Sequence, residues 1–409
     1  MLIEFKITNF RSLGDEQIIS FIPATMQKEY PENIYSKNGY LALNAIAIYG
    51  ANGSGKTNLL KAIKTFHQMI YLSAKNSSTS SLPYDPFLLK EGLKEMPTTF
   101  EITFIYQENR YRYGFSYFSD RIINEWLYRK KVGREVPLFI REEDAVDVSS
   151  GFKGNQRIID AAIEATRNNA LFLSTCDTLN IEEATDIFQW FKQLIVVEGI
   201  KDNEGCTTIN LWKTDEYKEK IKKYLSTLQL GFIDIDVIFD ADSGNSQVKI
   251  VTQHAVYTEE GKKSGNYLSM DFNEKESAGT KKVFELSGPI LWALANGGVL
   301  VIDEIEAKMH PILTLNAIRM FLSKETNPHQ AQIIFATHDT NLLSYSNLRR
   351  DQIYFSEKNQ WESTEIYSLS DFKYMGDASA ERPDKDKEKR YLEGRYGAIP
   401  VLTILGLSK

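Results

Sequence analysis

Eight residues near the start of the chain constrain its fold more than any other segment. Residues Gly50–Thr57 have the sequence GANGSGKT, which matches the pattern G-x-x-x-x-G-K-[ST]. The preceding residues, Ala45–Tyr49, form a short apolar run typical of a strand buried on both faces of a parallel sheet. From Asn58 to about Tyr71, apolar residues recur at helical spacing. This order of strand, glycine-rich turn and helix predicts an α/β fold with a phosphate-binding loop.

The residue types in this turn suit contact with phosphate. Its glycines allow the backbone to approach closely, so that main-chain N–H groups and the start of the helix face an anion. We expect Lys56 to reach the β- and γ-phosphate oxygens and the Thr57 hydroxyl to be a ligand of Mg²⁺. The residues expected to bind the nucleotide here are Asn52, Gly53, Ser54, Gly55, Lys56, Thr57 and Asn58.

A second apolar run, Val299–Ile302, ends in the two carboxylates Asp303 and Glu304. This is the form of the acidic strand that accompanies a phosphate-binding loop. We expect Asp303 to hold Mg²⁺ and Glu304 to polarise the attacking water as a general base.

A third apolar run, Ile333–Ala336, is followed by Thr337 and His338. Adjacent parallel strands place their carboxyl ends over the same ligand, so His338 is expected to contact the γ-phosphate or the lytic water. Catalysis is therefore assigned to Glu304, His338 and Lys56, and the metal to Thr57 and Asp303.

These three motifs, in this order, resemble the ABC/SMC ATPase superfamily. The opening segment Ile3–Ser12, with Asn9-Phe10-Arg11-Ser12, also resembles the first strand of RecF- and SMC-like heads, which implies that Arg11 lies near the nucleotide. The resemblance further implies ATP and Mg²⁺ as ligands. It also implies a dimer in which a signature motif of the second copy caps the γ-phosphate.

Two segments are candidates for that signature motif. Glu285–Pro289 contains Leu-Ser-Gly with Ser287, but leaves only about 14 residues before Asp303 for the usual helix and turn. Glu276–Thr280 opens a plausible helix and resembles the E-S-x-G-T form of the motif. We therefore assign the signature to Ser277 and Gly279.

The similarity is most specific to the ATPase domains of OLD-like and AbiL/RloA-like bacterial proteins associated with phage defence. It rests on the E-S-x-G-T motif, Asp303–Pro311, Thr337–Asp339, Arg350–Ile353 and Tyr391–Pro400. Within it, His310 stands where many ABC proteins have an aspartate, and no glutamine of a Q-loop can be assigned. The resemblance implies an ATP-driven switch that controls a separately encoded effector, a nuclease or toxin. No nuclease-like carboxylate cluster follows His338.

The expected fold is an α/β P-loop NTPase with an ABC-ATPase-like head, made of a parallel core sheet and an antiparallel β lobe. Helices are predicted at Gln156–Ala170, Ile181–Leu194 and Asp215–Leu228, and no heptad array supports a long coiled coil. The predicted organisation is an N-terminal ATPase lobe at 1–132, an inserted helical and β region for regulation or partner binding at 133–264, and a C-terminal ATPase lobe at 265–409.

Charge and hydropathy limit the alternative functions and locations of the protein. The formal net charge of −7 argues against a generally basic nucleic-acid coat protein. A RecF-like DNA-repair ATPase stays open, as does a nucleotide-gated scaffold that does not hydrolyse ATP. Apolar stretches fall far short of the roughly 20 residues that cross a bilayer, so we expect a cytoplasmic protein without membrane contact. Direct DNA contact would use two basic clusters: Arg129, Lys130, Lys131 and Arg134; and Lys218, Lys220, Lys222 and Lys223.

Overall fold

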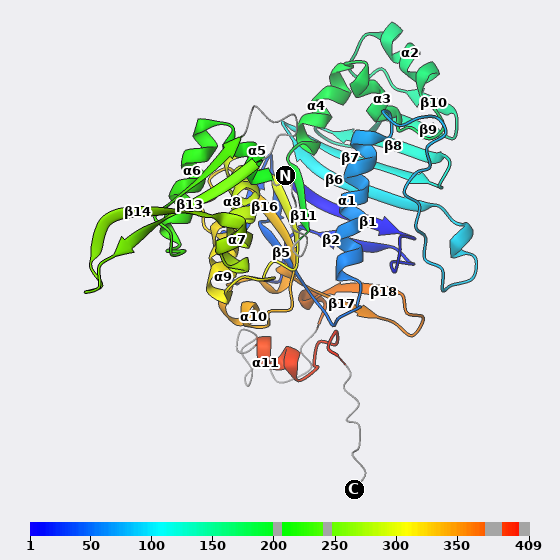
Figure 1. Ribbon diagram of the computed structural model, residues 1–409. Coiled ribbons are helices and arrows are strands. Elements are labelled where there is room, and N and C mark those ends of the chain that lie inside the picture. Colours follow the sequence, from blue (N-terminus) through cyan, green and yellow to red (C-terminus); the bar gives the residue numbers. More distant parts are fainter. Residues whose placement is uncertain (199–206, 240–247, 373–386, 401–409) are drawn as a thin grey trace.

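The computed structural model describes residues 1–198, 207–239, 248–372 and 387–400. Its centre is a six-stranded sheet with the order β11-β15-β16-β5-β17-β18, in which all pairs except β17/β18 are parallel (Figure 1). Most of its strands are short and mainly apolar, as expected of a parallel sheet covered on both faces. They are β5 (Ala45–Tyr49), β11 (Leu194–Glu198), β15 (Val299–Asp303), β16 (Gln332–Ala336), β17 (Ile353–Lys358) and β18 (Thr364–Ser368).

Both faces of this central sheet are covered by helices. In β5, Ile46 and Ile48 join one buried cluster, with α1 (Lys56–Leu72). The alternate residues Ala45, Ala47 and Tyr49 join a second cluster, with α8 (Ala278–Asn296) and α9 (Pro311–Leu322). The alternation of side chains along a strand thus places α1 opposite α8 and α9.

The antiparallel lobe is a seven-stranded sheet with the order β10-β9-β8-β7-β6-β1-β2. In β1 the odd-numbered residues Ile3, Phe5 and Ile7 are buried, as the period-two pattern predicts. Phe66 of α1 stacks on Phe115 of this sheet, with ring centroids 5.5 Å apart, so one helix packs against both sheets. The strands are β1 (Leu2–Thr8), β2 (Gln17–Ser20), β6 (Thr98–Tyr106), β7 (Asn109–Tyr117), β8 (Ile122–Lys130), β9 (Val136–Glu142) and β10 (Ala145–Val148).

Three helices continue the lobe after β10: α2 (Gln156–Ala165), α3 (Phe172–Thr178) and α4 (Glu182–Phe191). The start of α3 is tied to the sheet by the buried Glu125, which accepts hydrogen bonds from the main-chain N–H groups of Phe172 and Leu173. Arg141 lies 3.7 Å from the same carboxylate and compensates its buried charge.

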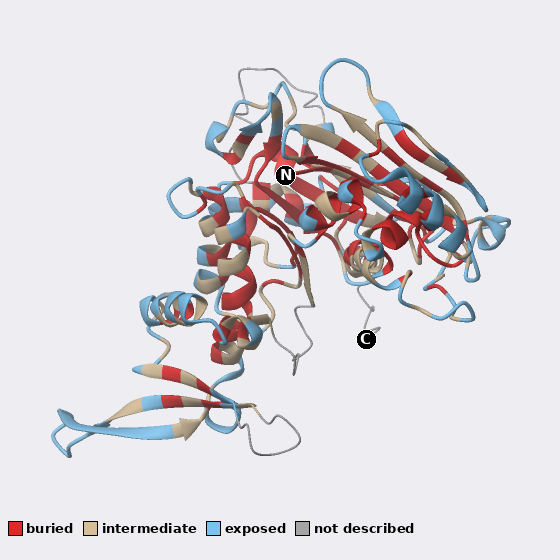
Figure 2. Ribbon diagram, turned by 90° about the horizontal axis from the view of Figure 1, so that it is seen from above, coloured by how far each residue is buried: buried red, intermediate tan, exposed pale blue. Residues whose placement is uncertain are grey.

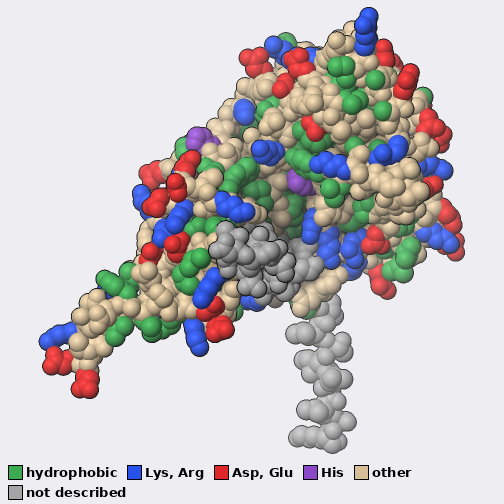
Figure 3. Space-filling model, turned by 45° about the horizontal axis from the view of Figure 1, so that its top comes forward, with side chains coloured by type: hydrophobic (Ala, Val, Ile, Leu, Met, Phe, Trp, Pro, Cys, Tyr) green, Lys and Arg blue, Asp and Glu red, His purple; other side chains and the backbone are tan. Residues whose placement is uncertain are grey.

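A separate part, which we call the arm, projects from the body (Figures 2 and 3). Its three-stranded sheet has the order β12-β13-β14, and the first seven residues of β14 are exposed. The arm has its own small apolar cluster, which includes Trp212, Ile221 and Phe284 of α8. Its elements are α5 (Thr207–Trp212), α6 (Asp215–Thr227), β12 (Asp234–Phe239), β13 (Val248–Tyr257), β14 (Lys263–Asp271) and α7 (Phe272–Lys275).

Short elements complete the description: β3 (Ile34–Lys37), β4 (Tyr40–Leu43), α10 (Asn341–Tyr345) and α11 (Lys387–Leu392). The 3-10 helices are Pro31–Asn33, Leu93–Glu95, Arg350–Gln352 and Leu369–Asp371. In the described ranges, the longest helix, α8, has 19 residues. No helix there is long and apolar enough to span a bilayer.

The range 133–264, predicted as one insertion, lies in three places. Strands β9 and β10 with helices α2 to α4 extend the antiparallel lobe, β11 is an edge strand of the central sheet, and only the elements from α5 onward form the arm. The predicted boundary at 264 falls inside β14. The predicted helix Ile181–Leu194 ends at Phe191, because Leu194–Glu198, with three β-branched residues at its centre, pairs with β15 instead.

Candidate nucleotide-binding site

The loop between β5 and α1 is held in a conformation that requires glycine. Gly55 is the N-cap of α1 with a φ of 112°, and a Cβ there would lie 2.1 Å from Oγ1 of Thr364. A Cβ on Gly50 would lie 2.3 Å from the main-chain oxygen of Ser356. The loop backbone therefore packs directly against the β17–β18 hairpin, without room for a side chain.

A polar pocket of about 230 Å³ opens over this loop. It is several times larger than the roughly 30 Å³ that one water occupies, and so has space for phosphate groups. The structure brings together the seven predicted loop residues with two residues from other strands. The lining consists of Asn52, Gly53, Ser54, Gly55, Lys56, Thr57, Asn58, Glu304 and His338.

Lys56 is buried at the base of the pocket, with 5% of its surface exposed. Its Nζ donates hydrogen bonds to the main-chain oxygens of Gly50 at 2.8 Å and Ala51 at 3.1 Å. Burial lowers the pKa of Lys56, and three nearby carboxylates oppose this shift. The loop thus holds a cation at the point where an anion would enter.

The side-chain oxygens near Lys56 show whether the site suits a metal ion. Oδ1 of Asp303 is buried without a hydrogen-bond partner among the described residues. Burial raises the pKa of Asp303, while a hydrogen bond from Thr57 and the charge of Lys56 oppose the shift. A carboxylate and a hydroxyl side by side are the oxygen donors that Mg²⁺ prefers, so the residues present fit this ion.

Glu304 and His338 reach the pocket from neighbouring strands. Because β15 and β16 pair in parallel, the segments that follow them emerge at the same edge of the sheet. Burial and the charge of Asp303 raise the pKa of Glu304. Burial and the charge of Lys56 lower the pKa of His338, so its imidazole is neutral at neutral pH.

Glu306 belongs to the same edge and was not predicted as a site residue. Its Oε1 accepts a 2.6 Å hydrogen bond from the main-chain N–H of His338, and its Oε2 is buried without a described partner. The sequence signals are a third carboxylate two positions after Glu304 and its place within Asp303–Pro311, one of the segments that carry the resemblance.

Three of the predicted nucleotide-binding residues lie outside the pocket lining. Arg11 pairs with Asp85, with Nε 3.4 Å from Oδ2. Ser277 is exposed at the start of α8, where its Oγ accepts a hydrogen bond from the N–H of Thr280 at 3.1 Å. Gly279 is the second residue of the same helix, and a Cβ there would lie 2.8 Å from the main-chain oxygen of Lys308.

The alternative signature residue, Ser287, has a different position. It is fully buried in the middle of α8, and its Oγ donates to the main-chain oxygen of Phe284 at 2.6 Å. A hydroxyl in this position faces the protein interior. Of the two candidates, Ser277 is the one at an exposed helix start, where main-chain N–H groups are available.

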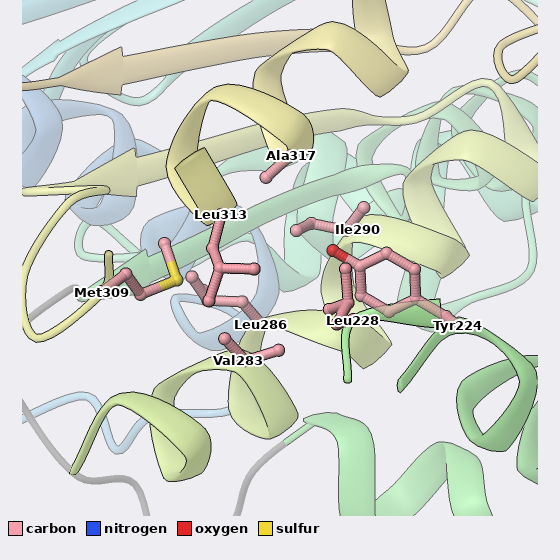
Figure 4. Close-up of a pocket in the computed structure, with 8 residues that line it drawn as sticks. All are labelled: Tyr224, Leu228, Val283, Leu286, Ile290, Met309, Leu313 and Ala317. Carbon is pink, nitrogen blue, oxygen red and sulfur yellow. The ribbon is translucent and has the colours of Figure 1, made fainter. Parts of the chain in front are cut away.

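The helix that starts at Ser277 also connects the site to the arm. A small apolar cavity, which we call the joint, lies between α6, α8 and the segment around α9 (Figure 4). Met309 of the joint precedes His310, whose Nδ1 caps α9 by accepting from the N–H of Ile312. The joint is lined by Tyr224, Leu228, Val283, Leu286, Ile290, Met309, Leu313 and Ala317.

Many of the basic residues considered for DNA contact are paired with carboxylates. Lys218 and Lys222 each lie 3.0 Å from an aspartate of β12, and Lys220 lies 2.6 Å from Glu216. In the other cluster, Arg129 binds the buried Glu183 at 2.9 Å. Their charge is largely compensated within the chain.

The central parallel sheet, the glycine-rich loop and the acidic strand end together define a P-loop NTPase. A protein-family model described as "AAA domain, putative AbiEii toxin, Type IV TA system" matches residues 45–344. The chain belongs to this AAA family, and nucleotide binding follows from membership. The match begins at the first residue of β5 and covers Lys56, Asp303 and His338, but not β17 or β18. A search of curated proteins finds no match.

Proposed function

We propose that the chain is an ATPase that works as a switch: it binds Mg-ATP, closes around it with a second copy of itself, and hydrolyses it. The observation that carries this proposal is the pocket in which the phosphate loop meets Glu304 and His338. These side chains come from three separate strand ends and converge where a γ-phosphate would lie.

Each residue has a distinct part in the proposed reaction. Lys56 neutralises phosphate charge, and the loop N–H groups orient the β- and γ-phosphates. Thr57 and Asp303 would hold Mg²⁺, which neutralises the charge that develops on the phosphates. Glu304 accepts a proton from the attacking water, and its raised pKa makes it a stronger base than an ordinary glutamate. The neutral imidazole of His338 hydrogen-bonds the γ-phosphate or that water.

The second copy is proposed because Ser277 and Gly279 start a long helix at an exposed position away from their own pocket. An ABC-like arrangement would place this helix start against the partner's γ-phosphate, where the helix dipole favours an anion.

We further propose that the switch acts on a separate effector, a nuclease or toxin, as part of a bacterial defence system. The family description supports a link to toxin systems. The arm and the C-terminal residues 387–400 offer surfaces that closure could move, since the joint connects the arm to α8.

One set of measurements tests this function. Phosphate release should be ATP-dependent and require Mg²⁺, and light scattering should show a dimer with Glu304→Gln plus ATP but not with ADP. Tagged Glu304→Gln purified from its native host, with and without phage infection, should retain the effector. Recovery of the ATPase alone, together with tight and steeply salt-dependent DNA binding, would favour the RecF-like alternative instead.

A further inference from the structure

We propose that Ser12 and Thr364 are positioning residues that orient the phosphate-binding loop through the main-chain carbonyl of Ser54. This inference rests on the proposed function, in which that loop binds the phosphates of ATP. Neither residue touches the pocket, and both lie outside the range matched by the family model.

The carbonyl of Ser54 is held by two hydroxyl groups of the β17–β18 hairpin. Oγ1 of Thr364 donates to it at 2.8 Å and Oγ of Ser356 at 3.1 Å. Both hydroxyl-bearing residues are fully buried, and Ser54 is 3% exposed. Water cannot replace these hydrogen bonds without opening the hairpin from the loop.

The hydroxyl of Thr364 also makes a second hydrogen bond. Which group is the donor in it follows from the number of protons available. Its single proton is used on the Ser54 carbonyl, which can only accept. In the 2.8 Å contact with Ser12, the proton must therefore come from Ser12. The Ser12 hydroxyl in turn accepts from Nδ2 of Asn58 at 2.8 Å. The result is a directed chain from Asn58 through Ser12 and Thr364 to Ser54, in which each bond polarises the next.

This chain joins three segments that are far apart in the sequence. Ser12 lies after β1, Thr364 opens β18, and Asn58 lies in the first turn of α1. The main chain reinforces the connection, because the N–H of Thr364 donates to the carbonyl of Ser12 at 2.7 Å. The chain therefore clamps the loop between the antiparallel lobe and the hairpin.

Fixing the Ser54 carbonyl also fixes a donor on the other side of the same peptide. The peptide is planar and trans, so the N–H of Gly55 points opposite to the carbonyl of Ser54. With the carbonyl held against the hairpin, this N–H is directed away from it, toward the side on which Gly55 lines the pocket. A donor that is oriented before the nucleotide arrives costs less to order on binding.

The steric fit leaves the loop little freedom to turn. A Cβ on Gly55 would lie within 2.8 Å of three side-chain atoms of Thr364. The two residues are therefore in direct contact, and a change at position 364 acts on the loop without an intermediate.

The test compares substitutions that differ only in the hydroxyl. Thr364→Val keeps the shape but removes the donor and acceptor, whereas Thr364→Ser keeps both. Glu365→Gln, at the exposed neighbour on the same strand, is the matched control. Ser12→Ala breaks the chain at its middle and keeps the inference testable if Thr364→Val does not fold.

We expect Thr364→Val and Ser12→Ala to weaken ATP binding about tenfold, the change that corresponds to about 1.4 kcal/mol. Thr364→Ser and Glu365→Gln should bind as the wild type does. Turnover at saturating ATP should change much less than affinity, since Glu304 and His338 lie on other strands. If these residues only supported the fold, the substitutions would instead lower the melting temperature, without a larger effect on ATP affinity than on turnover.

Hydrogen exchange of residues 50–58 in the nucleotide-free protein measures the order of the loop without requiring ATP hydrolysis. It therefore tests the positioning role independently of the proposed function. Faster exchange there in Thr364→Val, but not in Thr364→Ser, supports the positioning role even if the wild type does not hydrolyse ATP. Unchanged exchange and unchanged ATP affinity in both Thr364→Val and Ser12→Ala would overturn it.

Discussion

The main-chain N–H of His338 donates a 2.6 Å hydrogen bond to Oε1 of Glu306. This bond joins the segment after β15, which carries the proposed general base Glu304, to the segment after β16, which carries the proposed γ-phosphate sensor His338, so the two segments are directly connected. Burial of the second oxygen of Glu306 makes the contact more costly to lose.

Glu306→Ala should therefore lower turnover with little effect on ATP binding. Loss of a hydrogen bond to a charged group costs about 1.5–3 kcal/mol, so a reduction of at least about tenfold in kcat is expected. Glu306→Gln keeps an accepting oxygen and should lose less. Steady-state phosphate release and binding of a fluorescent ATP analogue measure the two effects. Equal kcat in Glu306→Ala and the wild type would show that the contact has no part in turnover.

Substitutions of Lys56 and Glu304 should have opposite effects on bound nucleotide. Lys56→Ala removes the cation that faces the phosphates and should abolish ATP binding. Glu304→Gln alters only the group that acts on water, so ATP should still bind. The rate of its hydrolysis should fall by about 10²–10⁴-fold. Calorimetric titration and single-turnover hydrolysis distinguish these outcomes. Wild-type hydrolysis by Glu304→Gln would remove Glu304 from the role of general base.

Activity should fall on the acidic side of neutrality. Glu304 must be ionised to accept a proton, and its raised pKa places the loss of activity above the ordinary glutamate value of about 4.3. His338 has a lowered pKa, so it stays neutral until the pH falls below the ordinary histidine value of about 6.5. Between pH 7 and 8 the imidazole of His338 stays neutral. Profiles of kcat, with binding of a non-hydrolysable analogue measured at each pH, test this expectation. Activity that rises as the pH falls below 6 would contradict both assignments.

The parts of the site that the sequence predicts are those encoded locally. The glycine-rich loop, Asp303, Glu304 and His338 each follow a short apolar strand, and parallel pairing alone brings strand ends together. The predicted α/β P-loop fold is confirmed for the same reason. No local pattern predicts the contact between Ser12 and Thr364, because the two residues are 352 positions apart in the sequence.

Local sequence patterns also could not predict that residues 133–264 are divided among the antiparallel lobe, the central sheet and the arm. Strand β11 is only five residues long and is apolar, so periodicity could not separate it from the helix before it. Its pairing with β15 decides its place, and that contact depends on residues about 100 positions away. The position of Arg11 was likewise inferred from resemblance alone, whereas its ion pair with Asp85 depends on the loop before β6.

Ser277→Arg should bind ATP normally but neither dimerise on ATP nor hydrolyse it. Ser277 is exposed and lies outside its own pocket, so a bulky cation there leaves the phosphate loop intact and blocks only the approach of a second copy. Mixing Ser277→Arg with Lys56→Ala tests the shared site directly. A heterodimer of the two has one site with an intact Lys56 and an intact Ser277, so mixing should restore ATP hydrolysis at no more than one site per dimer. Ser287→Ala is the matched control within the same helix and should hydrolyse ATP as a dimer. Full activity of Ser277→Arg alone would mean that the site is completed within one chain or by another segment.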